Sequence, residues 1–191
     1  MSEEILKLFK ETGAYLSGHF ELTSGQHSDA YFQCALLLQH PALSEKLFKT
    51  LSDKFRDKGA TVIVGPSVGG IVVSFEVARQ LGARSIYVER ENGALRFRRN
   101  FEIRKREKVL VVEDVVTTGG STQEVISLVR REGGEVVGVG ALVDRSGGGV
   151  RYDVPFESLL RLQVESFLKE ECPLCKKRIP FTQPGSRGHS Q

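Results

Sequence analysis

Apolar residues recur along the chain at two spacings, which predict where helices and strands form. Helical spacing is found in four segments, residues 3–12, 42–57, 70–81 and 121–131. Short apolar, β-branched runs typical of buried strands are found at residues 61–64, 85–88, 109–112 and 136–143. Because strands and helices alternate from residue 61 onward, the pattern predicts an α/β fold with a mostly parallel central sheet flanked by helices.

Three segments fall outside this alternation. Residues 19–38 combine turn residues with short apolar stretches, which predicts a strand-loop-strand hood within residues 1–40. Residues 89–107 hold a turn at Glu91-Asn92-Gly93 and six arginines, which predicts a basic hairpin or mobile loop. Residues 171–191 lack periodicity and are expected to wrap or fray as a C-terminal tail, so the main domain is expected to span residues 1–170.

Composition narrows the class of protein. The 191 residues include 27 basic and 24 acidic ones, a balance that makes general nucleic-acid binding an unfavoured reading. No apolar run approaches the roughly 18 residues of a membrane span, and the first ten residues lack a signal-peptide core. Three cysteines are too few for a disulfide framework. We therefore expect a cytoplasmic protein with no membrane partner.

The segment Cys172-Pro173-Leu174-Cys175 has the spacing of half a zinc site. A second cysteine pair is absent and only His189 follows, so the sequence assigns no metal ligands. A site shared between two subunits and a pair of plain thiols both stay open.

The strongest chemical signal is Val109–Thr122, which reads VLVVEDVVTTGGST. A buried strand here runs into two carboxylates, Glu113 and Asp114, at the end of a parallel sheet where ligands gather. Adjacent carboxylates accept hydrogen bonds from vicinal ribose hydroxyls and repel phosphate. Two acids at the end of an apolar strand are costly to bury without partners, which favours a sugar-binding site.

The residues that follow the acids favour a phosphate. Residues 117–122 offer hydroxyls, unobstructed backbone N–H groups and the positive end of a predicted helix. Neither of the two common glycine-rich nucleotide motifs is present. The turn at residues 65–70 offers bare backbone at a second strand end, although glycines needed only for packing would give the same pattern. The sequence thus predicts a ribose 5-phosphate site.

Residues 109–122 resemble the signature with which type I phosphoribosyltransferases bind phosphoribosyl pyrophosphate (PRPP), and the resemblance implies their fold. It implies that Glu113 and Asp114 hold the ribose hydroxyls, that Ser67, Val68 and Gly69 form the pyrophosphate loop, and that Mg²⁺ is held mainly through PRPP. The implied phosphate loop consists of Val115, Val116, Thr117, Thr118, Gly119, Gly120 and Ser121.

Other segments resemble the members of this family that act on orotate. These are Leu22-Thr23-Ser24-Gly25, Tyr31-Phe32 and Asp144-Arg145. The resemblance implies that Thr117 and Arg145 bind orotate, and an arginine can pair bidentately with its carboxylate. Tyr31 and Phe32 would flank the base, although core packing is the expected role for at least one of them.

The predicted mobile loop departs from the family pattern. Many relatives carry Arg, Lys, Lys and His there, whereas this chain continues Arg90 with Glu91-Asn92-Gly93-Ala94, and Thr23 stands where relatives often carry Lys. Arg90, Arg98 and Arg99 are the catalytic candidates in the loop, and a solvated basic face is the alternative. The general acid, if one is needed, stays unassigned. The resemblance also implies a homodimer in which the loop reaches the partner subunit.

The expected reaction transfers ribose 5-phosphate from PRPP to orotate, giving orotidine 5-phosphate and pyrophosphate in pyrimidine biosynthesis. Two alternatives remain open: a phosphoribosyltransferase for a purine or uracil, and a non-catalytic PRPP sensor that binds nucleic acid through the basic stretch 96–106.

Overall fold

The computed structural model describes residues 2–22 and 25–184, which divide into two compact units. Residues 40–162 form the larger unit, and residues 2–39 with 163–184 form the smaller one. The chain enters the smaller unit for the second time at residue 163, so the predicted tail belongs to the same unit as the predicted hood.

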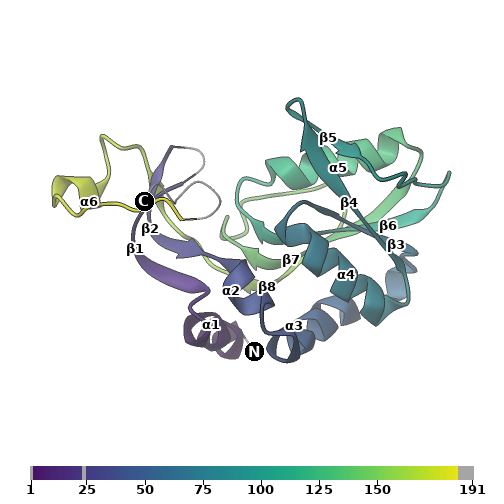
Figure 1. Ribbon diagram of the computed structural model, residues 1–191, viewed down its shortest axis with the longest axis horizontal. Coiled ribbons are helices and arrows are strands. Elements are labelled where there is room, and N and C mark those ends of the chain that lie inside the picture. The colour runs from purple at the N-terminus through teal and green to yellow at the C-terminus, as the bar shows by residue number, and fades with distance from the viewer. Residues whose placement is uncertain (1, 23–24, 185–191) are drawn as a thin grey trace. The chain divides into compact units, whose positions relative to one another are not determined.

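The larger unit is built on a six-stranded sheet of order β5-β4-β3-β6-β7-β8 (Figure 1). All neighbouring pairs are parallel except β4 and β5, which are antiparallel, so the predicted mostly parallel sheet is confirmed. The strands are β3 (Val62–Pro66), β4 (Arg84–Glu91), β5 (Ala94–Phe97), β6 (Lys108–Val116), β7 (Glu135–Asp144) and β8 (Phe156–Arg161).

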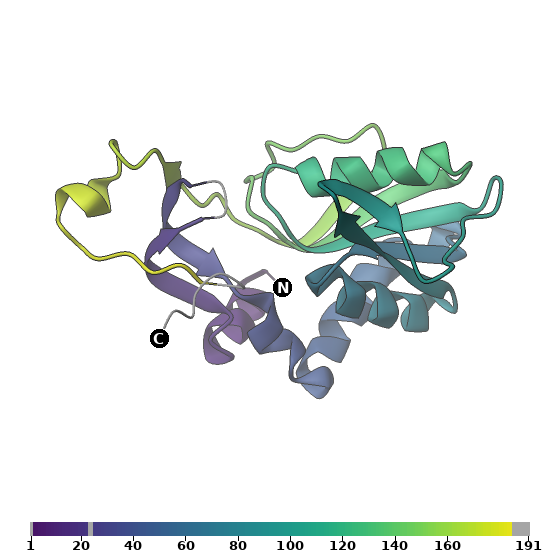
Figure 2. The same cartoon turned by 45° about the horizontal axis from the view of Figure 1, so that its top comes forward.

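Helices cover both faces of this sheet, as Figure 2 shows. α3 (Pro41–Asp53) and α4 (Gly69–Leu81) pack on one face, and α5 (Gly120–Arg131) packs on the other; a 3₁₀ turn, η1 (Arg56–Lys58), follows α3. Because both faces are buried, the central strands are continuously apolar, and each of the five residues of β3 is buried. Predicted helices at 42–57, 70–81 and 121–131 correspond to these elements.

The side chains of successive residues of β6 point to opposite faces of the sheet. Val109 and Val111 join a core cluster with Val125 and Val129 of α5. Leu110 between them is fully buried on the opposite face. That face is close-packed: a Cβ at Gly138 of β7 would lie 2.7 Å from the ring of Phe55. The central strand is thereby fixed in position from both sides.

The predicted basic hairpin is formed by β4 and β5. Asn92 and Gly93 connect the strands with φ angles of 50° and 82°, as a two-residue type I′ turn requires. Glu91 and Ala94 pair directly across the turn. The hairpin extends the sheet at the edge next to β3.

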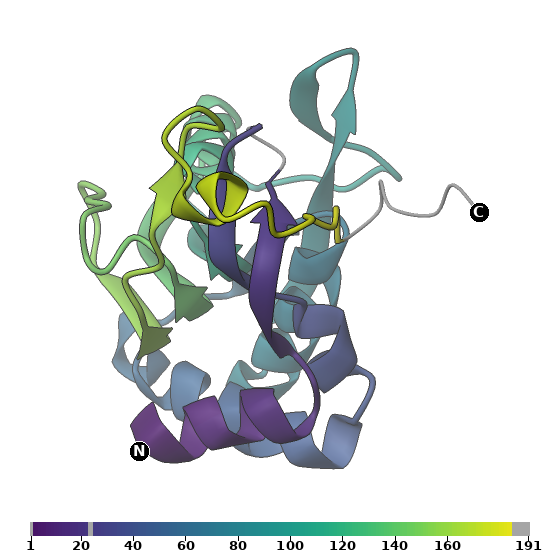
Figure 3. The same ribbon diagram turned by 90° about the vertical axis from the view of Figure 1, so that its left-hand side faces the viewer.

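The smaller unit contains a three-stranded antiparallel sheet of order β1-β2-β9. Its elements are α1 (Ser2–Glu11), β1 (Tyr15–Glu21), β2 (His27–Phe32), α2 (Cys34–Leu38), β9 (Ser166–Phe167) and α6 (Pro173–Lys176). The predicted helix at 3–12 and the strand-loop-strand hood are confirmed. Figure 3 shows the C-terminal segment crossing the β1-β2 hairpin, where Thr182 bridges to Phe20. The tail therefore wraps around the hood and adds the short helix α6.

Among the described residues, no helix has both the length and the apolar composition needed to cross a membrane.

Leu110→Ala is expected to lower the free energy of unfolding by about 2–5 kcal/mol, because it leaves a cavity beneath the central strand. Urea denaturation followed by circular dichroism measures the change. Leu43→Ala on α3, where the side chain is 46% exposed, is the control and should cost at most about 0.5 kcal/mol. Equal losses in both variants would contradict the assigned core.

Candidate active site

The two predicted acids lie at the end of β6, the strand in the middle of the larger unit's sheet. Glu113 is only 8% exposed and Asp114 is half-buried. Burial raises the pKa of Glu113 well above the ordinary carboxyl value of 4.5, and the charge of Asp114 adds to the shift. The Asp114 carboxylate accepts a hydrogen bond from the Val115 N–H at 2.9 Å. Glu113 is thus disposed to keep its proton, and Asp114 is the more accessible of the two acids.

The loop after β3 lies directly against these acids. A Cβ atom added to Gly69 would overlap the carboxylate of Asp114. Ser67 and Val68 are exposed, and Ser67 is anchored by its N–H, which donates to the Val88 carbonyl at 2.9 Å. The predicted pyrophosphate loop and the predicted ribose-binding acids therefore meet, and only glycine at position 69 permits the approach.

The predicted phosphate loop leads from β6 into α5. Thr117 and Thr118 are exposed, whereas Val116 is buried in the strand. Gly119 precedes the helix with a φ of +78°, and a side chain there would collide with Val150 and Tyr152.

The first turn of α5 has backbone N–H groups that make no hydrogen bond within the helix. The N–H of Gln123 makes the first bond back to the Gly119 carbonyl, so the N–H groups of Gly120 and Ser121 precede the helix's internal bonds. These donors and the positive end of the helix suit a phosphate. Burial also raises the pKa of the Tyr152 hydroxyl next to Gly119.

The next strand end carries the predicted orotate-binding arginine. Val116 of β6 pairs with Asp144 of β7, and the Arg145 N–H donates to the Val116 carbonyl at 2.8 Å. Thr117 and Arg145 therefore leave adjacent strands at the same level. The structure brings these two predicted residues together beside the acids.

Asp144 has a supporting role that the sequence did not reveal. Its fully buried carboxylate accepts hydrogen bonds from the Ser146 N–H at 2.9 Å and the Ser146 hydroxyl at 2.6 Å, and pairs with Arg161 at 3.1 Å. These bonds fix the backbone on both sides of Arg145.

Glutamates compensate the arginines of the hairpin. Arg98 pairs with Glu91 at 3.5 Å, and Arg99 donates two hydrogen bonds of 3.1 Å to Glu89. Arg99 lowers the pKa of Glu89 by these hydrogen bonds. Arg98 and Arg99 are therefore each paired with a carboxylate.

Arg90 reaches α5, the helix that follows the predicted phosphate loop. It donates to Glu124 of α5 at 2.7 Å, and the same carboxylate accepts the Leu95 N–H at 2.7 Å. The hydrogen bond from Arg90 lowers the pKa of Glu124. Glu124 stands three residues after Ser121, so it ties the hairpin to the first turns of α5. Sequence reasoning missed Glu124, whose only signal is an acid near the start of this helix.

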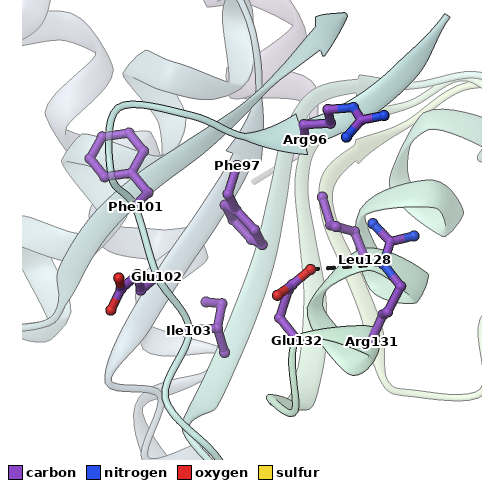
Figure 4. A pocket seen from close by; sticks show the side chains of 8 residues that line it. All are labelled: Arg96, Phe97, Phe101, Glu102, Ile103, Leu128, Arg131 and Glu132. Carbon is purple, nitrogen blue, oxygen red and sulfur yellow. Dashed lines mark ion pairs between the residues drawn. The ribbon is translucent and has the colours of Figure 1, made fainter.

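A pocket of about 470 Å³ lies elsewhere in the larger unit (Figure 4). It is lined by Arg96, Phe97, Phe101, Glu102, Ile103, Leu128, Arg131 and Glu132. The last three belong to or follow the C-terminal turns of α5, the helix whose N-terminus follows the predicted phosphate loop. An α-helix of 12 residues is about 18 Å long, so this pocket is separate from the predicted phosphate loop.

The hood residues lie in the smaller unit. Phe32 is buried and its ring packs edge-on against Phe9 and Tyr15 at 5.6 and 5.2 Å between centroids, as core residues do. Tyr31 is half-buried beside Phe20. Thr23 and Ser24 lie outside the described residues, as does His189.

Comparisons with family models and with known proteins point to the same family. The model of the phosphoribosyl transferase domain matches residues 35–170. The chain is 56% identical to the orotate phosphoribosyltransferase of Pelotomaculum thermopropionicum and 49% identical to that of Chlorobaculum parvum. These alignments cover 97% of both chains in the first case, and 100% of this chain and 98% of the relative in the second.

Solved structures agree. The crystal structure of orotate phosphoribosyltransferase from Aeropyrum pernix superposes with a TM-score of 0.70 at 27% identity, covering 83% of this chain and 94% of that one. The fold, the domain match and the near-complete alignments converge. The chain belongs to the phosphoribosyltransferase family and, within it, to the orotate phosphoribosyltransferases.

Proposed function

We propose that this protein transfers ribose 5-phosphate from PRPP to orotate, giving orotidine 5-phosphate and pyrophosphate. The observation that carries the proposal is the contact of Gly69 with the Asp114 carboxylate. With this contact, the loop proposed for pyrophosphate lies against an acid proposed for the ribose, and the strand that carries this acid leads into the N-terminus of α5. A molecule with a phosphate at one end of a ribose and a pyrophosphate at the other matches that order.

The acids are suited to the sugar. As the bond from the anomeric carbon to pyrophosphate lengthens, positive charge grows on the ribose ring and negative charge on the leaving group. Asp114 accepts a hydrogen bond from a ribose hydroxyl and lies where its charge favours a cationic ring. Glu113, whose pKa is raised by burial, offers a second carboxyl group next to that of Asp114. Thr118, Gly120 and Ser121 hold the 5-phosphate.

Mg²⁺ is the proposed cofactor. The oxygen donors at the strand end, the half-buried Asp114 carboxylate and the exposed Thr117 hydroxyl, are of the hard kind that Mg²⁺ takes alongside substrate phosphates. When bound through PRPP, the ion neutralises charge on the departing pyrophosphate. No residue of the chain needs to hold it alone.

The base is assigned through Arg145. Its planar guanidinium can pair bidentately with the carboxylate that distinguishes orotate from uracil and the purines. Thr117 on the adjacent strand end supplies a hydroxyl to the same ligand. The identity to relatives named for orotate supports this choice.

The hairpin arginines are proposed to stabilise the leaving pyrophosphate. Arg98 and Arg99 must exchange Glu91 and Glu89 for phosphate oxygens, and both pairs are solvent-exposed, so little stability is lost. Arg90 remains tied to Glu124 beside the phosphate loop. Arginine does not donate a proton at neutral pH, so these residues act by charge and hydrogen bonding.

We further propose a cytoplasmic homodimer in which the hairpin of each chain serves the partner's site. Family membership supports this assembly. Sedimentation equilibrium should give twice the chain mass of 21.2 kDa.

Arg145→Ala is expected to lower kcat/KM for orotate by about 10- to 100-fold, since hydrogen bonds between charged groups contribute about 1.5–3 kcal/mol. The loss of orotate absorbance with PRPP and Mg²⁺ measures the rate. PRPP binding, measured by calorimetry, should be unchanged.

The matched control is Arg151→Ala, which removes an exposed arginine six residues away and should leave the rate unaltered. Adenine, hypoxanthine and uracil are assayed in parallel. Consumption of one of these bases in place of orotate would overturn the base assignment. PRPP binding without consumption of any base would instead indicate a sensor.

Glu113→Gln is expected to change how stability depends on pH. Because the folded pKa of Glu113 lies above its ordinary value, the native state binds more protons and the free energy of unfolding falls as pH rises above about 4.5. The variant lacks this loss, so it should be more stable than the wild type at neutral pH, with the gap closing toward pH 4.5. Its affinity for PRPP should be lower.

Urea denaturation of the ligand-free proteins across this range measures the effect. Glu135→Gln, which removes an exposed carboxylate on β7, is the control and should show no such gap. A stability difference between Glu113→Gln and wild type that is constant with pH would show that Glu113 ionises normally.

A further inference from the structure

Four potential metal ligands converge in the smaller unit, and the proposed reaction uses none of them. They are His19 of β1, His27 of β2, Cys172, which directly precedes α6, and Cys175, which lies within α6. Their ligand atoms all lie within 4.8 Å of one another. His19, His27 and Cys172 are buried and Cys175 is half-buried. Residues about 150 positions apart therefore meet at one point.

The separations fit a tetrahedral zinc ion. Zinc–sulfur bonds of about 2.3 Å and zinc–nitrogen bonds of about 2.0–2.1 Å place a sulfur and a nitrogen about 3.5 Å apart at tetrahedral angles. The nearest ring nitrogens lie 3.5 Å from Cys172 Sγ and 3.3 Å from Cys175 Sγ. His19 Nε2 and His27 Nδ1 are 2.7 Å apart and need to separate by only about 0.6 Å to reach their tetrahedral spacing.

One histidine is already oriented as a metal ligand. His19 Nδ1 lies 2.7 Å from the Ile179 carbonyl, and since a carbonyl only accepts, Nδ1 carries the proton. In the neutral ring Nε2 then presents its lone pair to the other three ligands. Zinc-bound histidines commonly donate their second ring nitrogen to a carbonyl in this way.

Few apolar contacts hold the C-terminal segment, residues 163–184, in place. Within residues 163–184, Cys172 is the only buried residue, and Leu168, Ile179 and Phe181 are exposed. Apolar burial therefore holds little of this segment against the hood. The ring of Phe181 lies over His27, with 4.8 Å between centroids, and Thr182 hydrogen-bonds to the backbone of His19. These contacts surround the cluster.

We propose that His19, His27, Cys172 and Cys175 form a structural zinc site that fastens the C-terminal segment to the β1-β2 hairpin. The four side chains complete a Cys₂His₂ ligand set and leave no open coordination position, so the site is not catalytic. Small units with little core are often stabilised by such a metal. The β1-β2 hairpin supplies two histidines, the second half of a zinc site of which the Cys172–Cys175 pair is the first half.

Metal content tests the proposal without any substrate, so its outcome is separate from that of the proposed transferase activity. Chain purified without a metal-affinity tag and under reducing conditions is analysed by elemental mass spectrometry. The expected content is about one zinc per chain, as four-ligand structural sites hold. Cys172→Ser and Cys175→Ser should each lower the content by about tenfold or more, because thiolates dominate zinc affinity in such sites. Cys34→Ser is the matched control, a buried cysteine of α2 outside the cluster, and should retain the zinc.

A second measurement covers the case in which the variants fold poorly. The wild-type chain, stripped with a chelator and reloaded with cobalt, should show thiolate-to-metal charge-transfer absorption and the visible bands of a tetrahedral ion. Trypsin cleavage at Lys176, Lys177 and Arg178 should be faster in the stripped protein. Reduced wild-type protein that binds neither zinc nor cobalt stoichiometrically would overturn the proposal, as would zinc that persists at full content in Cys172→Ser.

Discussion

The burial of Glu113 beside a second carboxylate at the end of β6 is the constraint on which the active-site unit depends. A carboxylate that is nine-tenths buried next to a like charge is costly unless it keeps its proton or gains a partner. The two faces of β6 are tightly packed, by α5 on one side and by the α3-α4 layer on the other. That packing fixes the acids where two loops with bare backbone converge.

In the proposed reaction, binding is divided between rigid and adjustable parts of the structure. The acids, Gly69 and the first turn of α5 are fixed by backbone geometry, since any side chain at Gly69 would displace Asp114. The hairpin arginines are held by exposed ion pairs, which are weak enough to be exchanged for phosphate oxygens. Glu124 links the two parts, because it binds Arg90 of the hairpin from the helix that carries the phosphate loop.

Local signals in the sequence were sufficient for much of this fold and site. The apolar runs located four strands of the larger sheet, and the acids and the Thr-Thr-Gly-Gly segment after them located the junction of β6 with α5, because these features depend on neighbours in the chain. Strand β8 was missed, since its apolar residues do not alternate with polar ones and only two of its six residues are buried. β5 was predicted only as part of a basic hairpin or mobile loop, because its four residues are too few to show a strand pattern.

Contacts between residues far apart in the chain could not be predicted from the sequence. The ion pair of Arg90 with Glu124 and the meeting of His19 with Cys172 are products of the tertiary fold, and no spacing rule relates residues so far apart. The central proposal is that the β6-α5 junction holds a ribose 5-phosphate.

The most direct test is a titration of ¹⁵N-labelled protein with ribose 5-phosphate alone, followed by backbone amide chemical shifts. The account predicts that the largest shifts occur at Thr118, Gly119, Gly120 and Ser121, and that they saturate together. Shifts concentrated at Phe97 and Leu128, around the separate pocket, or no saturable shifts in the loop, would contradict it.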